Sequence, residues 1–277
     1  MVPRVCTAVW DIRSWLLDWY PLQMRIARVS VPDIAGPVFG VINGTKIGIL
    51  KSHPFGELEP TGVALDLDEV RILSPVLPSK VVCVGKNYAD HAKELGGEVP
   101  AEPVIFIKPN TTVIGENDPI VLPPQSTNVH HEVELAVVIS HLCKNVAVER
   151  AHEVILGYTI ANDVTARDLQ NADGQWTRAK SFDTFCPLGP WIETEIDPSN
   201  LELTCEVNGE VRQAGNTKDL VRSAHEMVAW ISNVMTLLPG DVILTGTPAG
   251  VGPINAGDIV EVTISGIGTL SNPVVKK

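Results

Sequence analysis

Short apolar segments separated by proline and glycine constrain the fold of this chain more than any other feature. Residues 80–85 (KVVCVG), 103–108 (PVIFIK) and 134–140 (ELAVVIS) are such segments, and the chain carries 22 glycines and 21 prolines. Apolar runs of this length that turn residues bound are typical of β-strands. No alternation of strands with helices, as in a doubly wound parallel sheet, is visible. We therefore expect a mostly β (α+β) protein built as a sandwich or a rolled sheet.

Two segments have the spacing of amphipathic helices instead. The first covers about residues 148–156. The second covers about residues 223–238, where Ala224, Val228 and Ile231 fall near one helical face. Two helices among many strands leave the predicted fold class unchanged.

The length of the apolar segments changes near two prolines, Pro75 and Pro78, after which these segments become longer. Before them, residues 24–50 read as short strands, and Asn43-Gly44 is a hairpin signal. We therefore predict a small N-terminal β domain at residues 24–78 and a larger domain at residues 79–277. Residues 1–23 are rich in tryptophan and are predicted to be an upstream extension. The alternative is a short amphipathic helix that covers an apolar surface.

Composition excludes some classes of partner. The formal net charge is −12, whereas nucleic acids and anionic membranes attract basic surfaces. The five cysteines form no CxxC pair, which indicates reduced thiols rather than a disulfide framework. No apolar run approaches the roughly 18 residues of a membrane helix. We expect a cytoplasmic protein that binds a small molecule, with neither nucleic acid nor membrane as a partner.

A candidate metal site begins in the stretch HHEVELAVVI at residues 130–139. Successive side chains of a strand point to opposite faces, so Glu132 and Glu134 would share one face with His130. Two neighbouring carboxylates repel each other unless a positive charge lies between them. Asp163 ends a second strand-like segment and could join them. Three carboxylates suit Mg²⁺ or Mn²⁺ better than zinc. The alternatives are a solvated strand face and an aspartate that caps a turn.

Polar residues that follow Asp163 indicate a ligand of negative charge. Arg167 and Gln170 lie a few residues downstream, and Lys180 follows in the segment WTRAKSF. Guanidinium and ammonium groups near a metal would bind a small anionic molecule. The alternative is an ordinary set of surface charges.

A possible acid–base pair lies in the segment CVGKNYADHAKELGG. Asn87 or Asp90 could cap a short helix on which His91 and Glu94 are spaced i, i+3 and so are neighbours. Glu94 would orient His91 to take a proton from water or substrate. The glycines at 96–97 would let the segment move as a lid. The alternative is an exposed pair of little energetic weight.

Six motifs in a fixed order resemble the fumarylacetoacetate hydrolase family: CVGKNYADHAKE, FIKPN, HHEVELAVVI, ANDVTARD, WTRAKSFDTFCPLGPW and LTGTPAGVGP. The resemblance runs from about Lys80 to the C-terminus, and residues 24–78 look like the small N-terminal domain of bacterial members. It implies a rolled mixed β-sandwich, a homodimer and a bound Mg²⁺ or Mn²⁺ ion. The residues that match the family's site are Glu132, Glu134 and Asp163 as metal ligands, His91, Glu94 and Lys180 as catalytic groups, and Arg167, Gln170 and Thr247 as substrate contacts. Lys108, in FIKPN, matches a motif without an assigned role.

The resemblance also implies a class of reaction. The expected chemistry is cleavage of the C3–C4 bond of a short 2-oxo diacid through a metal-stabilised enolate, with decarboxylation of oxaloacetate to pyruvate first. Hydrolysis of an acylpyruvate and isomerisation of 2-hydroxyhepta-2,4-diene-1,7-dioate are the alternatives. A non-enzymatic β-sandwich that binds cations or sugars is disfavoured, since aromatic residues are only 5% of the chain and such modules hold sugars with aromatic side chains.

Overall fold

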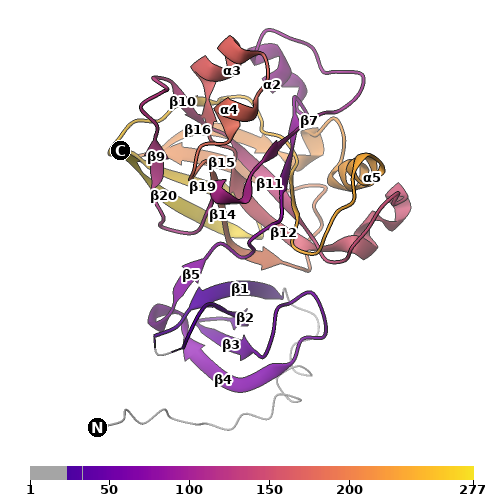
Figure 1. Cartoon of the computed structure of the whole chain (residues 1–277), viewed down its shortest axis with the longest axis vertical. Helices are drawn as coiled ribbons and strands as arrows, with labels where there is room; N and C mark the ends of the chain where they lie inside the picture. Colours follow the sequence, from indigo (N-terminus) through magenta and orange to yellow (C-terminus); the bar gives the residue numbers. More distant parts are fainter. Residues whose placement is uncertain (1–23, 33) are drawn as a thin grey trace.

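The computed structural model describes residues 24–32 and 34–277, and the mostly β fold class is confirmed (Figure 1). The first strands are β1 Arg25–Ser30, β2 Val38–Asn43, β3 Lys46–Leu50, β4 Pro60–Asp66 and β5 Arg71–Leu73. The following strands are β6 Val81–Gly85, β7 Val104–Lys108, β8 Val113–Ile114, β9 Ile120–Leu122, β10 Val129–His131, β11 Val133–Ile139, β12 Ile155–Asn162 and β13 Thr165–Ala166. The last strands are β14 Cys186–Glu193, β15 Glu202–Val207, β16 Glu210–Asn216, β17 Val242–Leu244, β18 Gly252–Pro253, β19 Ile259–Ile264 and β20 Gly268–Lys276.

Helical segments are short and lie between the strands. The α-helices are α2 Ala89–Glu94, α3 Arg167–Asp173, α4 Thr177–Lys180 and α5 Ala224–Val234. The 3₁₀ segments are η1 Leu67–Glu69, η2 Asn110–Thr112, η3 Val148–Val154 and η4 Thr217–Asp219. Helices α2, α3 and α4 gather at the same end of the molecule (Figure 1).

Three mixed or antiparallel sheets form the architecture. The largest has the order β4-β3-β2-β1-β14-β12-β11-β17-β6-β7, with β5 on β1 and β8 on β14. A five-stranded sheet has the order β16-β15-β19-β20-β9, and a small one the order β13-β10-β18. The pairs β17–β6 and β20–β9 are parallel, whereas most others are antiparallel.

Strand β11 lies in the core of the protein. This position explains why its residues are apolar except for Glu134. All seven of its residues are buried. Leu135 and Val137 belong to the core cluster that includes Leu203 and Val262 of the five-stranded sheet. Ala136 and its neighbours on the other face join a second cluster. A strand that is covered on both faces needs apolar residues at every position rather than at alternate ones.

The N-terminal strands β1–β5 occupy the lower part of Figure 1 and pack around a separate cluster of aliphatic side chains. The predicted hairpin is confirmed, because Asn43 of β2 pairs with Lys46 of β3 and Gly44 turns the chain with a φ of 54°. Strand β1 also pairs with β14, where Arg25 lies opposite Glu193. The largest sheet therefore continues from the N-terminal strands into the rest of the protein.

Both predicted helices are shorter in the structure. At residues 148–156 only the 3₁₀ segment η3 forms, and from Ile155 the chain is already strand β12, because pairing with β11 takes over. Helix α5 begins after Ser223, whose hydroxyl accepts a hydrogen bond from the Glu226 amide in a capping box. It ends at Val234, because Leu237 pairs with Cys143 in an extended bridge.

The two interpretations of residues 1–23, an upstream extension or a short amphipathic helix, lie outside the described residues. Within the described ranges, Cys83, Cys143, Cys186 and Cys205 are free and buried, as expected. No helix in the described part of the chain is long and apolar enough to cross a membrane.

Candidate active site

The three predicted metal-binding carboxylates come together at the centre of the protein. Oxygen atoms of Glu132, Glu134 and Asp163 all lie within 4.8 Å of one another, and the three residues are buried. The strand that was expected to carry both glutamates is broken at Glu132, between β10 and β11. At this break Asn162 accepts a hydrogen bond from the Glu132 amide at 2.9 Å, and the Glu132 carbonyl accepts one from the Asp163 amide at 2.8 Å. These bonds fix the two strand ends side by side.

His130 does not join the carboxylates in the way that strand alternation predicted. It belongs to β10 in the small sheet, is absent from the pocket lining, and has Nε2 at 2.9 Å from Asn128 Oδ1. Burial lowers its pKa to about 4, so the ring is neutral near pH 7. His130 is therefore a packing residue outside the pocket.

Buried cations surround the carboxylates. Lys180 Nζ lies 2.8 Å from Glu132 Oε2 and 2.7 Å from Asp163 Oδ2. Lys108 Nζ lies 2.5 Å from Asp163 Oδ1, and Arg167 forms an ion pair with Glu132 Oε1. Every one of these side chains is less than a tenth exposed. The alternative that Arg167 and Lys180 are surface charges is thus excluded.

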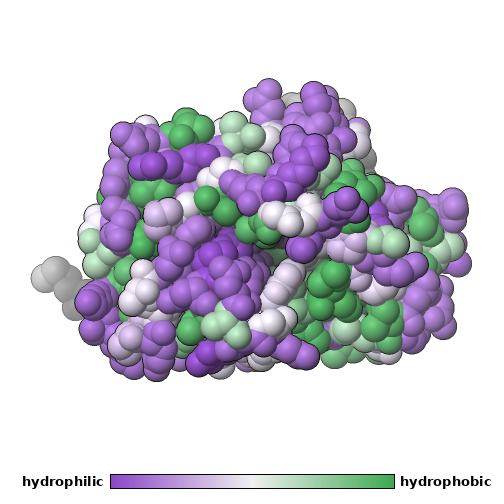
Figure 2. Space-filling view, turned by 90° about the horizontal axis from the view of Figure 1, so that it is seen from above, coloured by the Kyte–Doolittle hydropathy of each residue, from purple (hydrophilic) through white to green (hydrophobic). Residues whose placement is uncertain are grey.

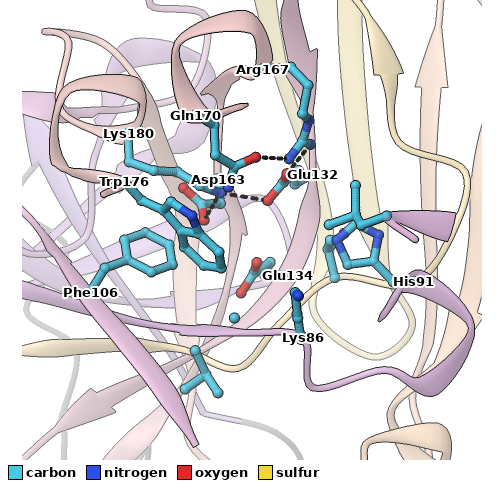
Figure 3. A pocket seen from close by; sticks show the side chains of 14 residues that line it. Lys86, His91, Phe106, Glu132, Glu134, Asp163, Arg167, Gln170, Trp176 and Lys180 are labelled. Atoms are coloured by element: carbon cyan, nitrogen blue, oxygen red, sulfur yellow. Dashed lines mark hydrogen bonds and ion pairs between the residues drawn. The ribbon is translucent and has the colours of Figure 1, made fainter. Parts of the chain in front are cut away.

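Helices α3 and α4 position the predicted ligand-binding groups. Arg167 begins α3, and Gln170 follows one turn later, so Arg167 Nη1 donates to Gln170 Oε1 at 2.5 Å. Lys180 ends α4 and crosses the Phe106 ring at 4.9 Å. Figure 3 shows these side chains converging with Glu132 and Asp163.

Glu134 differs from the other two acids in its surroundings. Its Oε2 accepts a hydrogen bond from the Gly246 amide at 2.5 Å, and no cationic side chain among the described residues pairs with it. Burial, and then the charges of Asp163 and Glu132, raises the pKa of Glu134. Burial is also the largest single influence on Glu132 and would raise its pKa, but Lys180 and Arg167 together outweigh it and the pKa is lowered.

This donor set fits a divalent metal. Three buried carboxylates with converging oxygens form a hard-oxygen site of the kind that Mg²⁺ and Mn²⁺ prefer. A cation beside Glu134 would relieve the repulsion that its raised pKa reports. The side chains that could hold such an ion are therefore Glu132, Glu134 and Asp163.

The His91–Glu94 pair is present on α2, as predicted. His91 Nδ1 lies 3.0 Å from Glu94 Oε2, and Glu94 Oε1 accepts a hydrogen bond from the Gly250 amide at 3.0 Å. A carboxylate only accepts, so His91 carries a proton on Nδ1, and the tautomer of the ring that has one proton leaves Nε2 as an acceptor. His91 is buried and lines the pocket (Figure 3).

The capping of α2 differs from the prediction. Tyr88 stands at the N-cap, and neither Asn87 nor Asp90 caps the helix with its side chain. The Asn87 amide instead donates to the carbonyls of Arg222 and Thr245 at 2.9 and 2.8 Å. It therefore ties the start of α2 to the loops after η4 and β17.

Thr247 lines the pocket, and Gln213 fixes the direction of its hydrogen bond. Gln213 Oε1 accepts from the Val133 amide at 3.1 Å, which assigns Nε2 as the donor to Thr247 Oγ1 at 2.7 Å. The Thr247 hydroxyl thus accepts here and keeps its own proton for a ligand. Gln213 was missed in the sequence because it lies on β16, far from every motif.

An apolar wall and an additional lysine were also missed. Trp176 packs edge-on against Phe106 at 5.3 Å and lies over Gly85, where a Cβ atom would come within 2.5 Å of the indole. Gly85, which ends β6, is the feature of the sequence that could have indicated a bulky side chain packed against this strand. The whole pocket is lined by Val84, Gly85, Lys86, His91, Leu95, Phe106, Glu132, Glu134, Asp163, Arg167, Gln170, Trp176, Lys180 and Thr247. The face above it is largely hydrophilic (Figure 2).

Two family profiles match the chain. The one described as fumarylacetoacetate (FAA) hydrolase C-terminal covers residues 80–275. The one described as Rv2993c-like, N-terminal covers residues 24–75.

Curated relatives align along nearly their whole length. Protein Rv2993c of Mycobacterium tuberculosis is 56% identical over 265 residues, covering 92% of this chain and 99% of the relative. The human mitochondrial protein named oxaloacetate tautomerase FAHD2A is 40% identical over 309 residues, covering 98% of both chains.

Solved structures agree with these matches. The 2-hydroxyhepta-2,4-diene-1,7-dioate isomerase from Mycobacterium marinum is 54% identical with a TM-score of 0.86, covering 92% of this chain and 99% of that one. Maleylpyruvate hydrolase from Sphingobium sp. SYK-6, in complex with manganese(II) ion and pyruvate, is 32% identical with a TM-score of 0.76, covering 91% and 99%. The chain therefore belongs to the fumarylacetoacetate hydrolase family.

Proposed function

We propose that this chain is a divalent-metal-dependent enzyme that acts on the enol or enolate form of a short 2-oxo diacid, with oxaloacetate as the substrate. The observation that carries the proposal is the balance of charge in the buried cluster. Three acids (Glu132, Glu134, Asp163) face three cations (Lys108, Arg167, Lys180). Counted as fully ionised, they cancel. A divalent cation would leave two positive charges beside the bound substrate, and this excess favours an anionic ligand such as a short diacid.

The relatives support the same substrate class. The human relative is named an oxaloacetate tautomerase, and it aligns with 98% of this chain. The related maleylpyruvate hydrolase was solved with manganese(II) and pyruvate, which is a 2-oxo acid.

Each side chain has a distinct task in this proposal. A divalent cation held by Glu132, Glu134 and Asp163 would supply a Lewis acid for the carboxylate and carbonyl oxygens of the substrate. Arg167 and Lys180 keep Glu132 ionised and add positive charge beside the substrate.

The remaining polar groups bind the substrate or move protons. Gln170 orients Arg167, and Thr247 donates its free proton to a substrate carboxylate oxygen. His91, held by Glu94 with Nε2 unprotonated, takes or returns the proton at C3.

Two reactions of oxaloacetate need these same groups. In keto–enol exchange C3 gains a proton, the C2 oxygen loses one, and no carbon–carbon bond breaks. In decarboxylation the C3–C4 bond breaks, its electrons form the pyruvate enolate, CO₂ leaves, and C3 then takes a proton. We place keto–enol exchange first because of the human relative, and C3–C4 cleavage, which the sequence alone favoured, second.

Two measurements on one sample test the proposal. The enol absorbance of oxaloacetate follows tautomerisation, and pyruvate release coupled to lactate dehydrogenase follows decarboxylation. Each assay is run with Mg²⁺, with Mn²⁺ and with chelator, against protein-free metal, since oxaloacetate loses CO₂ slowly with metal alone. Fast enol decay without pyruvate supports the tautomerase, and pyruvate release supports the decarboxylase.

Further substrates separate the alternatives. Acetylpyruvate tests the hydrolase and 2-hydroxyhepta-2,4-diene-1,7-dioate tests the isomerase. No metal-dependent change in oxaloacetate would contradict the proposal. The homodimer and the cytoplasmic location expected from the sequence stay predictions.

A further inference from the structure

We propose that Lys86 binds the second carboxylate of the substrate and makes the site prefer 2-oxo diacids to 2-oxo monoacids. This inference rests on the proposed function for the identity of the substrate class, and it concerns a residue to which neither the motifs nor the proposed reaction assigns a role.

The backbone places Lys86 in the pocket through an uncommon conformation. Lys86 follows directly after β6 and precedes α2, and its φ is 57°, in the left-handed region. For a residue with a side chain this conformation is unfavourable, and such residues cluster at ligand sites. Its side chain lines the pocket, and Figure 3 shows the amine pointing toward the space that Glu134 and His91 border.

Lys86 differs from the other pocket cations in having no acidic partner. Lys180 and Arg167 are both engaged by Glu132. Lys86 is half-buried, and its amine forms no ion pair and no hydrogen bond with the residues that the structure describes. An ammonium group that lines a pocket without an acidic partner is placed to bind an anionic ligand, and a carboxylate is the matching group.

The segment after α2 closes over the same amine. A Cβ atom on Gly97 would lie 3.0 Å from Lys86 Nζ, so the bare backbone of this glycine leaves just enough room for the ammonium group. Lys86 therefore lies between the pocket and the chain at Gly97, which follows the helix that carries the His91–Glu94 pair. A ligand bound to Lys86 would lie under that segment.

The other pocket walls offer no unpaired lysine or arginine for a second carboxylate. Val84, Leu95, Phe106 and Trp176 are apolar, and the buried cluster is engaged with the cation and the 2-oxo end of the substrate in the proposed arrangement. Thr247 provides a hydroxyl but no charge. Lys86 remains as the positive group for the far end of a diacid.

The test uses two stable ligands that differ only at that end. Malate is a short 2-hydroxy diacid, and 2-hydroxybutanoate has a methyl group in place of its second carboxylate. Titration calorimetry with Mg²⁺ present gives the dissociation constant of each ligand for the wild-type chain, Lys86→Met and Lys86→Arg. We expect the wild type to prefer malate. Lys86→Met should weaken malate binding about tenfold or more and leave 2-hydroxybutanoate unchanged, and Lys86→Arg should retain the preference.

A second variant keeps the lysine but moves it. Gly97→Ala places a methyl group against the ammonium group, so it should also weaken malate selectively. A wild-type chain without preference for malate, or a Lys86→Met chain that keeps the preference, would overturn the inference. These binding constants do not depend on turnover. Failure of the oxaloacetate assays with a clear malate preference would reject the proposed reaction but not the role of Lys86.

Discussion

Replacing Lys108 by methionine would remove a buried charge while keeping most of the side-chain length. Lys108 ends β7 and is fully buried. Its Nζ lies 2.5 Å from Asp163 Oδ1 and 3.1 Å from the Val164 carbonyl. In Lys108→Met the three acids of the cluster would face two cations, Arg167 and Lys180, so one negative charge would be left uncompensated inside the protein.

The expected magnitude follows from the remaining contacts. Removing one partner of a buried ion pair costs about 3–5 kcal/mol when the other charge is stranded. Asp163 keeps Lys180 at 2.7 Å, so we expect the lower end, about 3 kcal/mol. For a chain of this size that corresponds to a fall in Tm of about 6–12 °C.

The measurement is thermal unfolding of wild type and Lys108→Met, with chelator and with Mg²⁺. Bound Mg²⁺ would supply the missing positive charge, so it should raise the Tm of Lys108→Met more than that of wild type. The matched control is Lys46→Met, because the Lys46–Asp66 pair lies in solvent at the surface and contributes little to stability. The reasoning is refuted if Lys108→Met loses no more stability than Lys46→Met, or if Mg²⁺ stabilises wild type and Lys108→Met equally.

Three other perturbations test separate parts of the site and the fold. Glu132→Gln should weaken Mn²⁺ binding at least about tenfold in a direct titration and abolish metal-dependent turnover, and full turnover would show that the carboxylate cage is wrong. Gln213→Glu should raise the KM for oxaloacetate by about tenfold, because a carboxylate there would take the Thr247 proton that the substrate needs; an unchanged KM would contradict this hydrogen-bond direction. Burial lowers the pKa of His225 in the folded chain, so as the pH falls the unfolded chain binds a proton at this residue before the folded chain does. The stability that neutral His225 contributes is therefore present above about pH 6.5 and is lost as the pH falls. His225→Gln should therefore reduce the fall in Tm between about pH 7.5 and about pH 5.5, and an equal fall in both proteins would refute the assignment.

Local chemistry explains why much of the site was predictable from sequence. Helical spacing alone makes His91 and Glu94 neighbours, and the structure joins them at 3.0 Å. A run of apolar residues predicts β11. Acidic residues at its start and just after β12 are unusual in buried strands, so they indicate a site. Their buried oxygens meet within 4.8 Å.

Other features depend on residues that are distant in the sequence. Lys108 reaches Asp163 across 55 positions, and Gln213 reaches His131 across 82. No local pattern encodes such pairs, because they exist only once the sheets have packed. The same is true of the break at Glu132, where Asn162 takes the amide that a continuous strand would have used.

The sequence by itself determined the fold class, the family, the β2–β3 hairpin and the identity of the three acids, because these follow from hydrophobic pattern, turn residues and ordered motifs. Only the tertiary structure decided which charges neutralise one another, where η3 gives way to β12, and that Lys86 lines the pocket without an acidic partner in the described chain. The physical reason is that burial and charge pairing are set by all neighbours in space, whereas a sequence pattern reports only neighbours along the chain.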